Sequence, residues 1–177
     1  MIEDEAILNP EKLLAECDIQ KEHNVADFGC GPGIFSIPIA QMTEGTVYCF
    51  DILESALEAV NSRAQIVGLN NIVTRRVNLE KVRGSGLEDN SVNHVIMRKI
   101  LLQNENKKAL FIEARRVLDD DGKLLVVGWS KKAILGFGAN IRLSKEEVLR
   151  LANEGGFNNH RELEAGEYHY AFIFTTS

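Results

Sequence analysis

The sequence is poor in cysteine, and its 3 cysteines give no sign of a disulfide framework or of a zinc site. Cys17, Cys30 and Cys49 are odd in number and have no CxxC spacing, so we expect reduced thiols and a cytoplasmic protein. The sequence also lacks an apolar run near the roughly 20 residues that a transmembrane helix needs. Its first residues, Met1 to Glu5, are acidic where a signal peptide would be basic. We therefore expect no membrane span and no bound metal.

Basic residues are outnumbered, with 20 Lys and Arg against 26 Asp and Glu, and the net charge is −6. This balance argues against a large phosphate-binding surface, although Arg75-Arg76 and Arg98-Lys99 leave room for a local one. The hydrophobic fraction of 45% is that of an ordinary globular protein, and 177 residues suit one domain over residues 1–177.

The most informative segment runs from Val25 to Gly33 and predicts a buried strand, a glycine turn and the start of a helix. Glycines have no Cβ, so backbone amides in such a turn can come into contact with a ligand. The following helix would present unpaired N–H groups and a positive dipole end. A second predicted strand ends at Asp51, whose carboxylate can accept hydrogen bonds from both hydroxyls of a ribose. Together these features predict a site for an adenosine-containing cofactor.

Hydrophobic spacing and turn residues predict an alternating series of strands and helices. Apolar residues recur three and four apart from Leu53 to Val67, and Gly68 supplies a C-terminal stop. Ser144 followed by Glu147 predicts a capping box at the start of another helix. The predicted strands are 25–28, 46–50, 72–77, 91–97, 123–129, 157–163 and 168–174. The other predicted helices are 10–17, 34–42 and 110–118, with turns at 119–122 and 165–167.

This alternation predicts right-handed βαβ units and a largely parallel sheet, the architecture of an α/β protein. The last two strands, joined by the turn at 165–167, predict an antiparallel hairpin at one edge. His94 lies inside the strand 91–97, where we expect a hydrogen-bonded core imidazole.

In these motifs, the sequence resembles the class I S-adenosylmethionine-dependent methyltransferases from about Pro10 to its end. Asp27 to Gly33 matches the family's acid-x-Gly-x-Gly-x-Gly pattern, and Gly122 to Trp129 and Arg142 to Glu147 are further similar segments. The sequence is most similar to the small branch of the ubiquinone/menaquinone-type C-methyltransferases. The resemblance implies an α/β, Rossmann-like methyltransferase fold with a seven-stranded, mostly parallel sheet in the order 3-2-1-4-5-7-6 and a C-terminal antiparallel hairpin. It also implies methyl transfer with S-adenosylmethionine as the cofactor.

The resemblance further implies a set of cofactor-binding residues, which in chain order are Asp27, Gly29, Cys30, Gly31, Gly33, Asp51, Ile52, Asn78, Leu79 and Arg98. The first five, up to Gly33, would hold the methionine end of the cofactor. Asp51 would bind the ribose hydroxyls, and Ile52 would pack on the adenine. Asn78 and Leu79 would face the adenine ring, with Asn78 at a place where the family commonly has an acid. Arg98 would line the junction between cofactor and substrate.

Two other functions remain alternatives. A nicotinamide-dependent dehydrogenase would use the pattern Gly-x-Gly-x-x-Gly, but its third small residue would fall on Ile34, which is too bulky for that packing. A cofactor-binding accessory or sensor protein without its own catalysis fits the short chain and Asn78 in place of an acid. The spacing to Asp51 suits both nucleotide cofactors and does not separate them.

The methyl acceptor is expected to be a small molecule, with nucleic acid and protein acceptors left open. The segment Met97 to Ile100 lacks the Pro-Pro-aromatic motif with which the family methylates base amino groups. Arsenic methylation would need several converging thiols, and Cys17 and Cys49 are ill placed for it. The oligomeric state and the catalytic residues stay unassigned.

The acceptor should lie above the carboxyl ends of the fourth and fifth strands. Arg98 and Lys99 are there, either as a solvated strand end or facing an anionic substrate. Trp129 is either a core edge or a pocket lid, and the glycine-containing stretch 135–140 is a candidate lid. On the last strand, Tyr168 and Tyr170 share one face and His169 takes the other, each a candidate general base or pocket wall.

Overall fold

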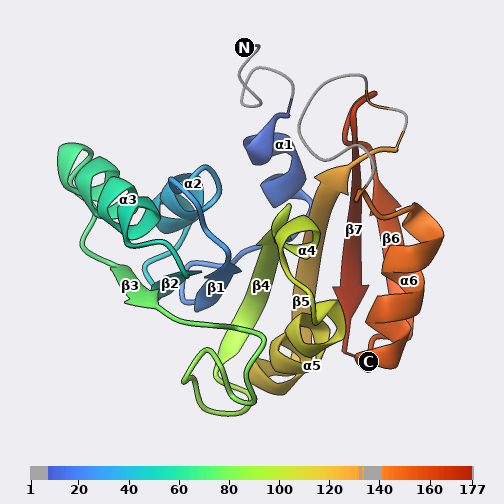
Figure 1. Ribbon diagram of the computed structural model, residues 1–177. Helices are drawn as coiled ribbons and strands as arrows, with labels where there is room; N and C mark the ends of the chain where they lie inside the picture. Colours follow the sequence, from blue (N-terminus) through green and yellow to red (C-terminus); the bar gives the residue numbers. More distant parts are fainter. Residues whose placement is uncertain (1–7, 132, 134–140, 177) are drawn as a thin grey trace.

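The fold is a seven-stranded sheet covered by helices on both faces (Figure 1). The computed structural model describes residues 8–131, 133 and 141–176. The strands are β1 (Val25–Phe28), β2 (Val47–Asp51), β3 (Ile72–Arg76), β4 (Val92–Arg98), β5 (Leu118–Trp129), β6 (Asn159–Leu163) and β7 (His169–Thr175). The helices are α1 (Pro10–Ala15), α2 (Ser36–Met42), α3 (Glu54–Ile66), α4 (Ile100–Gln103), α5 (Lys107–Val117) and α6 (Lys145–Glu154).

The strand order is β3-β2-β1-β4-β5-β7-β6, which confirms the predicted sheet. Strands β1 to β5 pair in parallel, and β7 is antiparallel to both β5 and β6. The chain order reverses between β1 and β4, since β2 and β3 lie on one side of β1 and the later strands lie on the other. In an open α/β sheet, ligands bind outside the carboxyl ends of the strands at this switch point. The fold therefore places the glycine turn after β1 at the expected binding position.

Two apolar clusters fill the space on the two faces of the sheet. One cluster joins α1, α2 and α3 to one face and contains Leu14, Ile39 and Val60, all fully buried. The other joins α4, α5 and α6 to the opposite face and contains Phe111 and Phe172. Because both faces are covered, the central strands are apolar on both sides, as the run 124–127 predicted.

Local signals predicted several helix ends correctly. Ser144 accepts a hydrogen bond from the backbone N–H of Glu147, and the Glu147 side chain accepts one from the N–H of Ser144, so the capping box of α6 is confirmed. Gly68 follows α3 with a positive φ of 72°, which confirms the predicted stop. Pro38 lies in the first turn of α2, where its missing N–H has no helical partner.

The predicted turn at 119–122 is wrong, because β5 begins at Leu118 directly after α5. Val92 pairs with Leu118 and His94 pairs with Lys123, so the residues between form an irregularity within the strand. The side-chain amide of Asn93 donates to Asp119 at 2.6 Å, and this bond across the two strands holds a run of acids that alone would favour a turn. No sequence pattern predicted the short α4, and α2 begins at Ser36, later than the predicted Ile34.

The amino ends of the central strands are closed by polar contacts. His94 is 2% exposed, and its Nε2 lies 2.9 Å from Nδ1 of His23, which confirms the hydrogen-bonded core imidazole. Burial, and after it the neighbouring His23, lowers the pKa of His94 to about 3. The side chain of Asn71 donates to three backbone carbonyls in the segment 40–45. The polar side chains at this end of the sheet therefore have a structural role.

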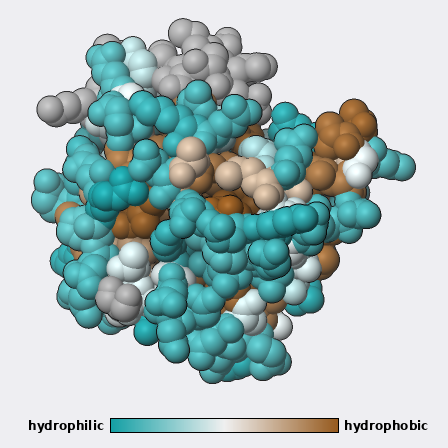
Figure 2. All heavy atoms as spheres, turned by 180° about the vertical axis from the view of Figure 1, so that it is seen from behind, coloured by the Kyte–Doolittle hydropathy of each residue, from teal (hydrophilic) through white to brown (hydrophobic). Residues whose placement is uncertain are grey.

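The face of the molecule seen from behind is mostly hydrophilic, with hydrophobic atoms showing in patches between the polar side chains (Figure 2). Of the large apolar side chains on the surface, Val82 is 95% exposed and Ile66 is 82% exposed. Among the helices that the structure describes, none is long and apolar enough to cross a membrane.

Candidate functional site

The glycine turn after β1 is attached to the end of β2. The backbone N–H groups of Gly29 and Cys30 both donate to the carbonyl of Phe50, at 2.8 and 2.9 Å. The φ values of Gly29, Gly31 and Gly33 are positive, at 72°, 52° and 85°. Residues with a Cβ rarely adopt such values. A Cβ on Gly31 would have no atom within 4 Å, so the space beside this backbone is open. The turn can therefore let a ligand come close to its main chain.

A cavity of about 330 Å³ lies in front of this turn. Its walls include seven of the ten residues that the family resemblance singled out: Gly29, Gly31, Asp51, Ile52, Asn78, Leu79 and Arg98. These residues come from the ends of β1, β2 and β4 and from the segment that follows β3. The fold thus brings together, in one cavity, residues that lie far apart in the sequence.

Asp51 connects the turn to the start of α3. Its Oδ2 accepts a hydrogen bond from the N–H of Gly31 at 3.0 Å, and its Oδ1 accepts one from the N–H of Leu53 at 2.9 Å. Each carboxylate oxygen can accept further bonds, since a carboxylate has about four lone-pair positions. The backbone therefore orients the carboxylate on the cavity wall and leaves it with acceptor capacity.

On the β3 side of the cavity, Asn78 and Leu79 belong to the segment 77–91 between β3 and β4. The side-chain oxygen of Asn78 accepts a bond from the N–H of Glu80 at 2.9 Å, so the Asn78 amide is held by its own turn. Gly84 packs against this turn, because a Cβ there would lie 2.4 Å from the carbonyl oxygen of Asn78. Leu79 is 4% exposed and belongs to the apolar core, whereas Ile52 is 56% exposed at the cavity rim.

Asp27, Cys30 and Gly33 do not line this cavity. Asp27 is 1% exposed, and the Ser36 hydroxyl donates to its Oδ2 at 2.5 Å, so the carboxylate links β1 to the first turn of α2. Burial raises the pKa of Asp27 to about 6, against the opposing effects of Ser36 and Arg98. Cys30 is buried, and a hydrogen bond with Cys49 together with burial raises the pKa of its thiol well above the usual range. These side chains support the turn from behind.

Gly33 lines a different and larger cavity of about 780 Å³ between α1, α2 and α3. That cavity lies on one face of the sheet among helix residues such as Ile37 and Ile66, away from the carboxyl ends of the strands. Size alone would favour it, but the glycine turn, the carboxylate of Asp51 and the switch point all meet at the smaller cavity. We therefore take the smaller cavity, which we name the β1–β4 cavity, as the candidate site.

Basic side chains gather at one end of the β1–β4 cavity. Arg98 and Lys99, at the end of β4, line its wall. The ammonium nitrogen of Lys99 lies 4.2 Å from the ring centroid of Trp129, at the end of β5. Burial, and after it the charge of Arg142, lowers the pKa of Lys99 to about 8. Lys99 also has a positive φ of 61°, a backbone conformation that non-glycine residues adopt at a cost.

Arg142 belongs to the same group, although it comes from the segment before α6. Its guanidinium carbon lies 5.3 Å from the Trp129 ring centroid. Its Nη1 donates to the carbonyls of Ser130 and Ala133, at 3.1 and 2.6 Å, so this buried side chain is held in place by the backbone. Sequence reasoning missed Arg142 as a site residue, because nothing in its local pattern shows which strand end it contacts.

The last strand contributes His169, whose ring stacks on Trp129 with centroids 4.4 Å apart. Burial, followed by the charges of Lys99, Arg98 and Arg142, lowers the pKa of His169 to about 4. Tyr170 points to the other face and is 3% exposed in the core, where burial raises the pKa of its hydroxyl. His169 and Tyr170 therefore lie on opposite faces, as predicted, and Tyr170 is a core residue, whereas Tyr168 precedes β7. The candidate lid at 135–140 lies outside the described residues.

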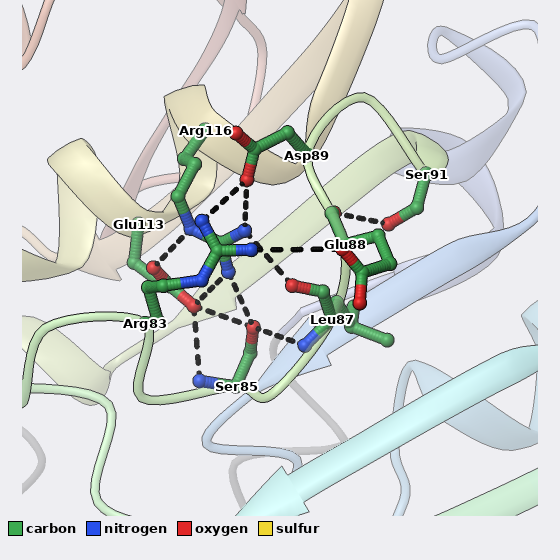
Figure 3. Close-up of polar contacts among 8 residues, drawn as sticks. All are labelled: Arg83, Ser85, Leu87, Glu88, Asp89, Ser91, Glu113 and Arg116. Carbon is green, nitrogen blue, oxygen red and sulfur yellow. Dashed lines mark hydrogen bonds and ion pairs between the residues drawn. The ribbon is translucent and has the colours of Figure 1, made fainter.

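A second charged group, the Glu113 cluster, holds the segment 77–91 against α5 (Figure 3). Glu113 is 3% exposed and accepts bonds from the N–H and the hydroxyl of Ser85, at 2.9 and 2.5 Å. Arg116 donates to both carboxylate oxygens of Glu113 and to Asp89. Arg83 completes the cluster with a bond to Asp89 at 2.9 Å. No described residues form a group of three or more His, Cys, Asp or Glu side chains that could hold a metal ion.

In a comparison with known families, the model of a family described as "Methyltransferase domain" matches residues 19–166, which is most of the chain.

Comparison with solved structures finds the same fold. A S-adenosylmethionine-dependent methyltransferase from Aquifex aeolicus superposes with a TM-score of 0.88 and 23% identity, over 98% of this chain and 92% of that one. An arsenic(III) S-adenosylmethionine methyltransferase from Chlamydomonas reinhardtii superposes with a TM-score of 0.75 and 23% identity, over 88% of this chain and 64% of that one. At 23% identity, this similarity shows that the fold is shared.

Among curated proteins, an uncharacterized protein of Haemophilus influenzae is 36% identical over 64 residues. The aligned segment is 36% of this chain and 24% of that protein, so the match spans about a quarter of the relative's length.

Proposed function

This chain belongs to the class I S-adenosylmethionine-dependent methyltransferases, and from that premise we propose that it transfers a methyl group to a small organic acceptor in the β1–β4 cavity. The observation that carries the proposal is the meeting of Gly31, whose backbone faces open space, with the oriented carboxylate of Asp51 on the same wall. A site of this kind suits a nucleoside with an amino-acid tail.

The described residues fit S-adenosylmethionine. Asp51 would accept bonds from the ribose hydroxyls, and Ile52 and Leu79 would pack against the adenine. Asn78, which replaces a commonly acidic residue, would face the adenine through its amide. The open backbone at Gly31 would lie along the amino-acid tail. Asp27 and Cys30, which lie behind the turn, would act by ordering its backbone.

When bound, the cofactor supplies a methyl group on a positively charged sulfur, which is already a good leaving group. The chain's own residues therefore need mainly to orient the acceptor and exclude water, and good orientation can supply about 7–11 kcal/mol in favourable cases. Arg98 and Lys99, at the end of β4, line the cavity wall, and Lys99 lies over the ring of Trp129 at the end of β5. A general base is needed only for an acceptor that must lose a proton.

The finer assignment is to the small branch of ubiquinone/menaquinone-type C-methyltransferases, and it is supported by the motif from Asp27 to Gly33. A small acceptor is supported by the compact cavity and by the segment Met97 to Ile100, which lacks the motif for base methylation. We also propose a cytoplasmic location, which the three buried free thiols support. The buried positions of all three thiols do not favour arsenic as the acceptor.

Calorimetric titration with S-adenosylhomocysteine tests the proposal. We expect one molecule to bind per chain, and Asp51→Ala to weaken binding by at least about tenfold, since a hydrogen bond to a charged group contributes about 1.5–3 kcal/mol. Asp120→Ala is the matched control, because this acid is exposed at the opposite end of the sheet. Absence of binding at millimolar ligand, or tighter binding of NADH in competition, would overturn the proposal.

A further inference from the structure

Three side chains that end in a carboxamide line the β1–β4 cavity: Asn78 after β3, Gln103 at the end of α4, and Asn104 directly after α4. The backbone N–H of Asn106 donates to Oε1 of Glu80, so the segment after β3 and the segment after α4 are attached to each other. The three carboxamides therefore share one end of the cavity, the end that the proposed function assigns to the adenine. We name these three side chains the amide group.

Carboxylates are scarce around this cavity. Among the described residues that line it, only Asp51 carries one, and the N–H groups of Gly31 and Leu53 hold that carboxylate on the ribose side. The carboxylate of Glu80 is not part of the described lining, and it accepts the N–H of Asn106. The edge of a bound base would therefore meet carboxamides, which both donate and accept hydrogen bonds, in place of a carboxylate, which only accepts them.

The backbone fixes the orientation of the Asn78 amide. A backbone N–H can only donate, so the side-chain atom that accepts from the N–H of Glu80 at 2.9 Å is the oxygen Oδ1. Oδ1 keeps a second lone pair, and Nδ2 has two N–H bonds to donate. Within the part of the chain that the structure describes, no group accepts a hydrogen bond from Nδ2. Asn78 thus offers an acceptor and a donor side by side at the cavity.

Two classes of purine differ at the edge that such a group would contact. A 6-aminopurine such as adenine has a donor on its exocyclic nitrogen and an acceptor at N1, whereas a 6-oxopurine such as hypoxanthine has an acceptor oxygen and a donor at N1. A carboxylate pairs with the amino group but opposes the oxygen of the second class with its own lone pairs. A carboxamide pairs with both classes, because one of its atoms accepts and the other donates.

We propose that the amide group makes the cofactor site tolerant of the base, so that the β1–β4 cavity binds S-inosyl ligands as well as S-adenosyl ligands. Asn78 determines this tolerance. With adenine, its Oδ1 accepts from the amino group and its Nδ2 donates to N1; with hypoxanthine, Oδ1 accepts from N1–H and Nδ2 donates to the oxygen. Ile52 and Leu79, which line the same cavity, contact the faces of either base. This inference rests on the proposed function and names the class of nucleoside that its site accepts.

Calorimetric titrations with S-adenosyl-L-homocysteine and with S-inosyl-L-homocysteine test the inference on the original protein. The two ligands have the same ribose and the same amino-acid tail, so the ratio of their dissociation constants reports on the base alone. We expect the preference for the adenosyl ligand to stay below about fivefold, which is about 1 kcal/mol. A larger preference for the adenosyl ligand would overturn the inference, and this comparison needs no variant.

Asn78→Asp should make the site selective at pH 7, where the new carboxyl group is ionised. The variant keeps an oxygen for the N–H of Glu80, so its turn is retained, but an acceptor replaces the donor Nδ2. We expect the preference for the adenosyl ligand to rise by at least about tenfold, which is about 1.4 kcal/mol. A smaller rise would overturn the role of Asn78 in reading the base.

Asn158→Asp is the matched control. This exposed residue precedes β6 at the edge of the sheet, and its side-chain oxygen accepts from the amide of Asn153, as a carboxylate oxygen also can. The control therefore makes the same change of charge with the same retained acceptor, far along the sheet from β1. We expect its ratio of dissociation constants to equal that of the original protein. An equal rise in both variants would show an effect of net charge and would overturn the role of Asn78.

The outcome is separable from that of the proposed function. If S-adenosylhomocysteine binds and S-inosylhomocysteine does not, methyl transfer stands and the tolerance of the base is wrong. If neither ligand binds, the proposed function falls, and this inference falls with it.

Discussion

Two charged clusters of this protein differ in the residues that they bring together. In the Glu113 cluster, acids and bases alternate, and Glu113 and Arg116 each form several hydrogen bonds (Figure 3). In a second group, which we name the Trp129 cluster, Lys99, Arg142 and His169 lie against one ring, that of Trp129. Burial, and after it neighbouring positive charge, lowers the pKa of Lys99 and of His169. The Glu113 cluster attaches the segment 77–91 to α5, whereas Lys99 of the Trp129 cluster lines the β1–β4 cavity.

The difference between the two clusters shows that buried charges have different roles in this fold. A buried acid paired with bases holds a loop, and its loss leaves an uncompensated charge. Basic side chains that share one ring shift one another's titration, so the loss of one charge should change the pKa of its neighbours.

The largest effect is expected at Glu113. Glu113→Ala removes the acceptor of Ser85 and Arg116 and leaves the half-buried guanidinium of Arg116 without its main partner. Breaking a buried pair in this way costs about 3–5 kcal/mol of the free energy of unfolding, which urea denaturation would measure. The control is Glu88→Ala, whose carboxylate is 91% exposed, with an expected loss below about 1 kcal/mol. Similar losses in the two variants would contradict the structural role of the cluster.

Asp27 sharpens the comparison, because it is a buried acid whose pKa is raised to about 6 from an ordinary 3.8. The folded state then holds its proton to higher pH than the unfolded state does, so stability falls as pH rises from about 4 to 6. Asp27→Asn should remove this dependence, and its stability relative to the original should improve by up to about 3 kcal/mol between pH 4 and pH 7. Unfolding curves at the two pH values measure it, and parallel pH dependences would contradict it.

Two glycines distinguish an effect on the candidate site from an effect on the stability of the fold. Gly31 and Gly68 both have positive φ, and a Cβ on either would have no atom within 4 Å. Alanine at each should lower the free energy of unfolding by about 1 kcal/mol, since both backbones are strained for a residue with a Cβ. Only Gly31→Ala should also weaken S-adenosylhomocysteine binding in a calorimetric titration. Equal affinity in both variants would place the cofactor away from this turn.

The smallest effect is expected inside the Trp129 cluster. Lys99→Gln removes one of the charges that depress His169, so the pKa of His169 should rise toward its usual range. An NMR titration of the His169 ring measures the change, and Lys21→Gln should leave that pKa where it is. A pKa of His169 that does not respond to Lys99 would argue against a coupled cluster.

Much of the fold could be predicted, because its signals are local. Most strands and most helices have their own apolar pattern, and Gly68 and Ser144 mark helix ends in the sequence. The turn at 119–122 was predicted wrongly, because the acidic run is held in β5 by pairing with β4 and by Asn93, which are contacts between distant segments. The short α4 was missed because its four residues carry no periodic pattern.

The two sides of the candidate site differ in the same way. Gly31 and Asp51 could be identified because one motif places them at the ends of neighbouring strands, and their roles remain predictions. Arg142 could not be placed, since its position beside Trp129 depends on how the segment before α6 returns to the sheet. Lys99 was visible as a charge, but its left-handed backbone and its contact with Trp129 are properties of the folded chain.

A crystal structure of the complex with S-adenosylhomocysteine tests the central claim most directly. We predict that the ribose hydroxyls lie within hydrogen-bond distance of the Asp51 carboxylate, with the sulfur toward Arg98 and Lys99. Density for the ligand in the larger cavity between α1, α2 and α3, with the glycine turn free of it, would contradict the account.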